Sequence, residues 1–266
     1  MRVVALTFHE VTLDQPDASA LQHTDPEAFY RITVSQLEQL LSQLRKRGYE
    51  AVSSREFRAW QQGEQTLPKR SVMLTFDDGY ASHFELVAPL LKRYRFNGIF
   101  FITVNLVGRP GHLSWDQVRK LAFLGMEIGS HGVSHRPLTS LSKQELEQEL
   151  VDSKRLLEER LGTAIQTIAA PGGFWNLTVA EAVKRAGYAT AWVSMIGTNG
   201  QQTHPLALRR VVVRWPFSAE RLVAMVEGWQ PAFWWAANQQ LLIKWLKRLL
   251  GVYRYEQLKR RLVPNA

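Results

Sequence analysis

The chain has 266 residues and 45% of them are hydrophobic, so it can bury one large core without a second domain. It has no cysteine, which excludes disulfide bridges, thiolate metal ligands and a cysteine nucleophile. Its net charge of +9 is concentrated near the end of the sequence. The remainder is close to neutral, so we expect no nucleic-acid partner.

Short apolar, β-branched runs alternate with helical patterns from the first residues onward. The runs predict strands at residues 3–8, 49–52, 71–76, 98–103, 126–129, 167–170, 190–194 and 208–213. The helical patterns cover residues 35–47, 54–61, 82–94, 114–124, 142–161 and 178–186. Seven or eight strands separated by helices favour a closed or nearly closed parallel barrel, with a flat doubly wound sheet as the alternative.

The sequence divides by composition into a catalytic barrel, residues 1–228, and a basic, aromatic tail, residues 229–266. The first residues read directly as a strand, without the basic and apolar stretches of a secretory signal, so we expect a cytoplasmic location. No apolar run approaches the roughly 20 residues that span a bilayer.

Two adjacent carboxylates, Asp77 and Asp78, follow the strand predicted at 71–76. With Gly79 behind them they are compatible with an ordinary polar turn. A metal ion would give them distinct roles, because one carboxylate can ligate the ion while its neighbour stays available as a base. Successive residues point in different directions, which suits that division.

Two histidines, His131 and His135, follow the strand predicted at 126–129. Their i and i+4 spacing predicts that they lie on one face of a helical turn, where they can share a cation. A pair of surface or capping histidines is the alternative. One aspartate and two histidines would leave coordination positions open for water and substrate, as a hydrolytic metal requires.

The segment Thr75-Phe76-Asp77-Asp78-Gly79, followed two strands later by Ser130-His131 and His135, resembles the polysaccharide deacetylase family, also known as carbohydrate esterase family 4 or the NodB-homology domain. The resemblance spans roughly residues 1–213 and includes Phe8-His9-Glu10-Val11 and the Pro-containing segment 169–173. It implies a distorted (β/α) barrel of about seven strands. It also implies a hydrolase that removes N-acetyl groups from an amino sugar in a polysaccharide, an oligosaccharide or a lipid-linked glycan.

The resemblance also implies roles for individual residues. Asp77 matches the general base, and Asp78, His131 and His135 match the ligands of one divalent ion, usually zinc. The ion would activate a water and polarise the acetyl carbonyl, and Asp77 would take the proton of the water. A backbone N–H near Gly172 would help to hold the oxyanion.

The sequence departs from the family pattern around its Pro-containing segment. Ala169 stands where the family often has an Arg that orients the base, and Arg209 or Arg210 could supply that group from a later strand. The alternative is that Arg209 and Arg210 are solvated surface residues. An aromatic residue of the family is replaced by Gly172. The residues that we expect near the substrate or the oxyanion are Pro171, Gly172, Trp175 and Arg210.

The general acid has no clean match, because the late histidine of the family is missing. His204, in a predicted loop, is the nearest in sequence, and His9, at the end of the first strand, is an equally plausible acid. The alternative for His9 is a buried histidine that hydrogen-bonds to backbone. These gaps leave two rival functions, namely a catalytically weak glycan-binding module and a deacetylase or deformylase of a nucleotide-linked sugar.

The tail combines cations with apolar side chains. It holds seven Lys or Arg against one Glu, so it carries +6 of the net charge of +9, and it holds four of the nine tryptophans. Its leucines and Trp245 fall on one helical stripe with cations beside it, which is typical of a helix at the inner face of a membrane. A helix packed on the barrel is the alternative.

Overall fold

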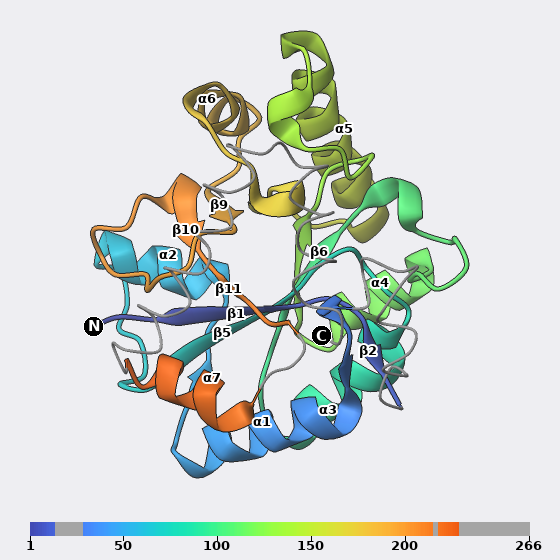
Figure 1. Ribbon diagram of the computed structural model, residues 1–266. Helices are drawn as coiled ribbons and strands as arrows, with labels where there is room; N and C mark the ends of the chain where they lie inside the picture. Colours follow the sequence, from blue (N-terminus) through green and yellow to red (C-terminus); the bar gives the residue numbers. More distant parts are fainter. Residues whose placement is uncertain (14–28, 215–217, 229–266) are drawn as a thin grey trace, which may run out of the picture.

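Nine parallel strands form one curved sheet in the computed structural model, which describes residues 1–13, 29–214 and 218–228 (Figure 1). The strands are β1 (Val4–Phe8), β4 (Glu50–Ala51), β5 (Ser71–Phe76), β6 (Ile99–Ile102), β7 (Glu127–Ser130), β8 (Thr167–Ala169), β9 (Thr190–Val193), β10 (Leu208–Arg209) and β11 (Val211–Val212). Their order is β10-β9-β8-β7-β6-β5-β1-β11, and β4 pairs with the start of β5. A second ladder, which the sequence did not predict, joins β2 (Val11–Thr12) to β3 (Ile32–Thr33).

A single interrupted strand closes the sheet. β10 pairs with β9, and after one residue, Arg210, β11 pairs with β1. The first and last strands of the order are therefore halves of the same segment, and the sheet becomes a distorted barrel. Counting β10 and β11 as one strand gives eight strands. The predicted (β/α) barrel is confirmed, and the flat-sheet alternative is wrong.

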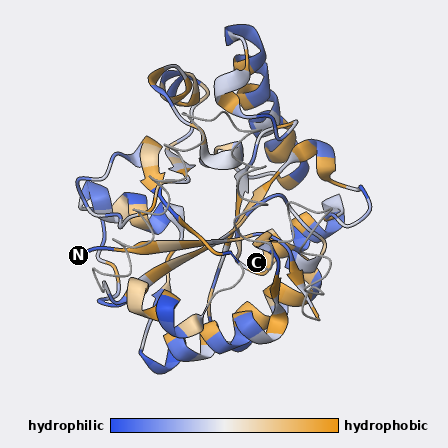
Figure 2. Cartoon of the chain, viewed as in Figure 1, coloured by the Kyte–Doolittle hydropathy of each residue, from blue (hydrophilic) through white to orange (hydrophobic). Residues whose placement is uncertain are grey.

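Helices surround the barrel and turn their apolar sides towards it (Figures 1 and 2). They are α1 (Val34–Lys46), α3 (Ala88–Arg93), α4 (Trp115–Phe123), α5 (Lys143–Leu161), α6 (Leu177–Arg185) and α7 (Ala219–Val226), of which α7 was not predicted. Ser or Thr side chains cap the starts of α1, α4 and α5. A π-helical turn, His83–Val87, precedes α3. None of the described helices is both long enough and apolar enough to cross a membrane.

Alternating side chains of the strands point to two different cores. In β1, Val4, Leu6 and Phe8 pack with the surrounding helices, whereas Ala5 belongs to a second cluster that fills the barrel. The other members of this inner cluster are Val3, Val52, Phe57, Met73, Ile99, Phe101, Ala169, Trp192 and Leu208. Continuing the alternation beyond the inner cluster brings polar side chains to the carboxyl end of the barrel.

Helix α2 (Ser54–Gln62) closes the amino end of the barrel instead of lying outside it. Its Phe57 belongs to the inner cluster, and Trp60 packs against the same cluster. The carboxyl group of Glu127, at the start of β7, accepts hydrogen bonds from the Ser54 N–H at 2.6 Å and from the Ser54 hydroxyl. Helix α2 thus closes the amino end, and we expect the active site at the carboxyl end of the strands.

Candidate active site

Asp77 lies directly after β5 and is held by Arg210 inside the barrel. The backbone N–H of Asp77 continues the ladder to Phe8, and its side chain is 3% exposed. Arg210 donates from Nη1 to Asp77 Oδ1 at 2.7 Å, and Arg210 is 1% exposed. Burial alone would raise the pKa of Asp77, but the guanidinium and two nearby imidazoles outweigh burial, so the pKa of this carboxyl is lowered. Asp77 is therefore a carboxylate at neutral pH.

Asp78 points to the two histidines. It has a φ of 75°, in the left-handed region that non-glycine residues seldom adopt, and this turns the chain away from the strand. Its Oδ1 lies 2.9 Å from His135 Nε2 and 3.3 Å from His131 Nε2. Burial raises the pKa of Asp78, but the nearby imidazoles of His131 and His135 outweigh burial, and the pKa ends well below its usual value.

His131 is oriented for ligation by its second ring nitrogen. The ring is buried, and Nδ1 lies 2.8 Å from the carbonyl oxygen of Ala169, to which it donates. This fixes the tautomer in which Nε2 carries a lone pair directed at Asp78. Ala169, where the family often has an Arg, therefore still serves the site, through its backbone.

Asp78, His131 and His135 fit a divalent cation. Their candidate ligand atoms all lie within 4.8 Å of one another. Asp78 Oδ1 is buried and has no hydrogen-bond partner of standard geometry among the described residues, although it faces two imidazole nitrogens. One carboxylate and two imidazoles are the donor set of hydrolytic zinc sites. His135 is 44% exposed at its side chain, which leaves one side of the cluster open.

The histidine segment is a loop, and here the sequence prediction of a helical turn is wrong. Residues 131–135 contain no helix, and both Gly132 and His135 have left-handed φ values, 79° and 61°. The two imidazoles still converge, with ring centroids 5.1 Å apart. Of the three non-glycine residues that have positive φ in the described chain, Asp78 and His135 belong to this cluster.

His9 lies beside the cluster at the end of β1. Its imidazole interacts electrostatically with Asp77, Asp78 and Arg210. Its Nδ1 is buried without a hydrogen-bond partner among the described residues. Burial lowers the pKa of His9, so its ring is neutral at neutral pH. Its ring centroid is 4.8 Å from that of Tyr30. The carbonyl of His9 accepts a hydrogen bond from His83 Nε2 at 2.9 Å.

Arg210 replaces the guanidinium that the family pattern would place at Ala169. It occupies the break between β10 and β11, and its guanidinium carbon lies 5.6 Å from the ring centroid of Phe101. Gly129 allows this arrangement, because a Cβ there would meet the Phe101 ring at 2.6 Å. We expected Arg210 to contact the substrate or the oxyanion. In the structure it pairs with Asp77, whereas the side chain of Arg209 is exposed.

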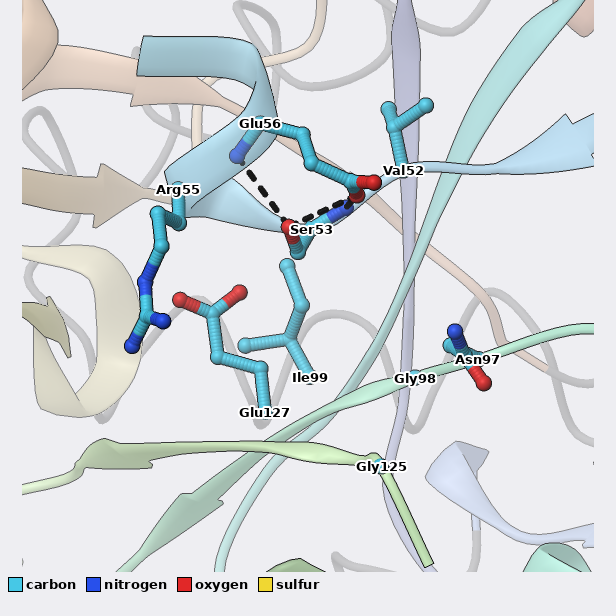
Figure 3. A pocket seen from close by; sticks show the side chains of 9 residues that line it. All are labelled: Val52, Ser53, Arg55, Glu56, Asn97, Gly98, Ile99, Gly125 and Glu127. Carbon is cyan, nitrogen blue, oxygen red and sulfur yellow. Dashed lines mark hydrogen bonds between the residues drawn. The ribbon is translucent and has the colours of Figure 1, made fainter. Parts of the chain in front are cut away.

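His204 lies at the wrong end of the barrel for catalysis, which corrects its place among the candidate acids. It precedes β10 and lines a cavity with Gln166 and Thr190, which stand at the amino ends of β8 and β9. Its Nδ1 accepts a hydrogen bond from the N–H of Leu206 at 3.2 Å. A neighbouring cavity of about 280 Å³ lies between Glu127 and the start of α2 at the same end (Figure 3).

The segment after β8 lies at the carboxyl end, as predicted. Pro171 is buried, Gly172 is exposed with a φ of 64°, and Trp175 packs partly against the outer core. Phe174 is 57% exposed beside Gly172. Their roles toward substrate or oxyanion stay predictions.

Two residues of α5 that the sequence did not single out support the histidine loop. Glu149 and Ser153 are buried on the same helix face as Leu146, Leu150 and Leu157. A polar residue on an otherwise apolar helix face was the available signal. Ser153 accepts a hydrogen bond from Ser130, the residue before His131, at 2.9 Å.

Known proteins resemble this chain in sequence and in fold. Residues 64–191 match the model of the family described as polysaccharide deacetylase. The protein named "Putative polysaccharide deacetylase YxkH" of Bacillus subtilis (strain 168) is 26% identical over 198 residues, which are 74% of this chain and 71% of that protein. The peptidoglycan-N-acetylglucosamine deacetylase of Bacillus cereus is 30% identical over 123 residues, 46% of this chain and 55% of that protein.

A solved structure shares the fold over nearly its full length. The Streptococcus pyogenes deacetylase PplD, in complex with acetate, superposes with a TM-score of 0.77 at 23% identity, covering 85% of this chain and 98% of that one. The family match, the relatives and the barrel agree with one another and with the Asp-Asp and His-x-x-x-His segments. These matches show that the chain is similar to polysaccharide deacetylases, and they indicate a hydrolase that deacetylates a glycan.

Proposed function

We propose that this protein is a metal-dependent hydrolase that removes the N-acetyl group from an amino sugar of a glycan. One observation carries the proposal. A buried carboxylate, Asp77, is kept ionised by Arg210 beside a cluster of Asp78, His131 and His135 whose ligand atoms converge. A base next to three ligands is the arrangement that hydrolysis of an amide requires.

Asp78, His131 and His135 would hold one divalent ion, for which zinc is our proposal. When bound, the ion supplies a Lewis acid for the acetyl carbonyl and lowers the pKa of a water. The Ala169 carbonyl keeps the lone pair of His131 Nε2 directed at the ligand cluster.

The two carboxylate oxygens of Asp77 have different surroundings and would have different roles. Oδ1 accepts the hydrogen bond from Arg210, and Oδ2 lies 4.0 Å from His131 Nε2, on the side of the ligand cluster. Oδ2 is therefore the oxygen that would take a proton from the attacking water. Arg210 stabilises the ionised form of the base and fixes its orientation.

His9 is our candidate for the group that assists the leaving amine. It borders the same aspartates, and its buried Nδ1 has no hydrogen-bond partner among the residues described. Such an atom is costly to bury unless a substrate or a water satisfies it during the reaction. Asp77 and His9 lie at the ends of adjacent strands, so both can act at one substrate.

The substrate class follows from the relatives. The Bacillus cereus relative is named for N-acetylglucosamine of peptidoglycan, so we propose an acetamido sugar within an oligomeric or polymeric glycan. The partly buried Trp175 and the exposed Phe174 offer aromatic surface to sugar rings. The chain spans 71% of the YxkH protein and 55% of the Bacillus cereus enzyme, so their whole activities are not transferred.

We further propose that the substrate is met at an anionic membrane surface and is lipid-linked. The support is the sequence of residues 229–266, with seven cations and four tryptophans. That tail lies outside the described residues. Co-sedimentation with anionic liposomes tests this part, and loss of binding on truncation after Gly228 is the expected result.

Two rivals remain, namely a weakly active glycan-binding module and a deacetylase or deformylase of a nucleotide-linked sugar. The ionised, oriented Asp77 favours an enzyme over a binding module, because binding alone requires no buried base. A panel of polymeric, lipid-linked and nucleotide-linked acetamido sugars, scored by acetate release, separates the two enzymatic readings.

The central experiment measures zinc content and acetate release together. We expect about one zinc per chain, and loss of both zinc and acetate release in the double variant H131A/H135A. His204→Ala, at the amino end of the barrel, is the matched control and should keep both. Full zinc occupancy and full activity in H131A/H135A would refute the proposal.

A further inference from the structure

We infer that Glu149 is a positioning residue that holds the loop between His131 and His135 in its ligating conformation. The inference rests on the metal site proposed above. Glu149 lies on α5, is 9% exposed, and belongs to none of the ligand or base positions. Its carboxyl group faces the loop and acts on the metal site only through the loop.

The loop has a conformation that its residues would not adopt alone. His135 is a non-glycine residue in the left-handed region, with φ at 61°, and Gly132 has φ at 79°. Such backbone persists only where the surroundings determine it. The groups that hold the loop therefore determine whether the two imidazoles face the same point.

One oxygen of Glu149 binds the middle of the loop. Oε1 accepts from the N–H of Val133 at 2.8 Å and from the N–H of Ser134 at 2.6 Å. The Ser134 hydroxyl lies 3.0 Å from both carboxyl oxygens. Two successive amides directed at one anion form a backbone nest, and here a side chain of the same protein fills it.

The approach of this carboxylate explains a glycine in the loop. A Cβ on Gly132 would lie 2.7 Å from Glu149 Oε1, closer than side chains tolerate. Gly132 therefore provides both the left-handed backbone and the space for the carboxylate. Gly132 and Glu149 therefore act together to hold the loop.

The other polar groups of the loop are held by rigid parts of the barrel. The carbonyls of Gly132 and Val133 accept from the backbone of Val104 and Asn105, and the N–H of His131 donates to Ile102. These contacts fix one edge of the loop to the end of β6. Glu149 holds the opposite edge, so its removal frees the N–H groups between the two ligands.

We predict that zinc affinity depends on the position of the acceptor oxygen at residue 149 more than on its charge. Glu149→Gln keeps a carbonyl oxygen for the two amides, and Glu149→Asp shortens the side chain by one methylene so that it no longer reaches them. We expect Glu149→Ala and Glu149→Asp to weaken zinc binding by about 10- to 100-fold, the usual range for groups that orient metal ligands. Glu149→Gln should stay within a few-fold of the wild type.

The test measures zinc affinity by competition with a chromophoric chelator, on full-length apoprotein. Hydrogen exchange at the amides of Val133 and Ser134 is measured in the same samples and should accelerate in Glu149→Ala and Glu149→Asp. The control is Glu147→Ala, an exposed glutamate on the same helix, which should match the wild type in both measurements. Thermal unfolding of each apoprotein reports any general loss of stability.

The outcomes separate the positioning role from a structural one and from failure of the metal site. Unchanged zinc affinity in Glu149→Ala with a lower unfolding temperature makes Glu149 merely structural and overturns the inference. Equal losses in Glu149→Gln and Glu149→Ala overturn the geometric explanation. Absence of zinc binding by the wild type refutes the proposed metal site itself, whereas wild-type binding with unaltered variants refutes only the role of Glu149.

Discussion

The two ends of the barrel both enclose a carboxyl group, and they treat it in opposite ways. At the amino end, the carboxyl of Glu127 is satisfied by the N–H and hydroxyl of Ser54, and α2 plugs the opening. At the carboxyl end, His9 Nδ1, Asp78 Oδ1 and Arg210 Nε are buried without partners among the described residues. Native proteins leave few such atoms. Gln61 Oε1 on α2 is another, but the three at the carboxyl end lie together around Asp77, and this clustering marks where a ligand belongs.

The pKa shifts at the two ends also run in opposite directions. Burial raises the pKa of Glu127, whereas Arg210 and the imidazoles outweigh burial at Asp77 and lower its pKa. Burial alone thus raises the pKa of a carboxyl group, whereas nearby positive charge lowers that pKa and keeps the group ionised. The cavities at the amino end, one of which is drawn in Figure 3, are therefore poor guides to the chemistry.

The largest difference between the ends should appear on removing the charge of each carboxylate. Asp77→Asn should lower turnover by about 10²- to 10⁴-fold, the range of a general base, with zinc retained. Acetate release and zinc content measure the two effects. Loss of zinc in Asp77→Asn would mean that Asp77, and not Asp78, is the ligand.

Histidines offer the second contrast. His9→Ala should lower turnover by about 10²-fold, because His9 borders the reaction centre, whereas His204→Ala should leave it unchanged. Steady-state kinetics on one acetylated glycan measure both. The reverse ranking would return the acid to His204 and contradict the placement of the two residues.

Arg210 should set the pH at which the base works. It lowers the pKa of Asp77, so Arg210→Met raises that pKa and moves the acidic limb of the kcat/KM profile to higher pH. The loss of a charge-assisted hydrogen bond should also cost about 10- to 100-fold in turnover. Arg209→Met, which changes an exposed neighbour, is the control. An unmoved acidic limb would show that Arg210 does not control the base.

The smallest effect is expected at Glu127. Its folded pKa is raised, so its contribution to stability is present below the usual value of 4.5 and is lost as pH rises through the raised pKa. Glu127→Gln keeps an acceptor for Ser54 and should change the unfolding free energy by no more than about 1 kcal/mol at neutral pH, with a flatter pH dependence. Urea unfolding at several pH values tests this, and a large fall in activity would contradict it.

Much of the fold was readable from the sequence because each element carries its own local pattern. The strand β5 was predicted with its observed bounds, and the predicted starts of α4 and α5, Ser114 and Ser142, are their N-caps. The interruption at Arg210 was not predicted, because residues 208–213 were treated as one strand although Arg209 and Arg210 lie within it. Which two strands the halves would pair with is a long-range property that no local pattern encodes.

The site was readable where its residues are adjacent in sequence and obscure where they are not. Asp77, Asp78, His131 and His135 came from short segments. Their shared end of the sheet followed from strand order. Glu149 was not singled out, because it lies within a helix that has many charged residues. His204 became a candidate as the nearest histidine in sequence to the late motif, but sequence alone did not show at which end of the barrel it lies. The i and i+4 spacing of the histidines suggested a helix, but Gly132 in the left-handed region makes a loop instead.

The interrupted strand that carries Arg210 also bears on how relatives of this chain are to be found. A search that demands Arg before the proline of residues 169–173 would reject this sequence as a degenerate enzyme. The guanidinium is nevertheless present, supplied to Asp77 by the strand that closes the barrel. Sequences that have Ala at the position of residue 169 and Arg at the position of residue 210 would then form a group in which the Arg has moved from one strand to another. In such a group, loss at one position is informative only when the other is inspected with it.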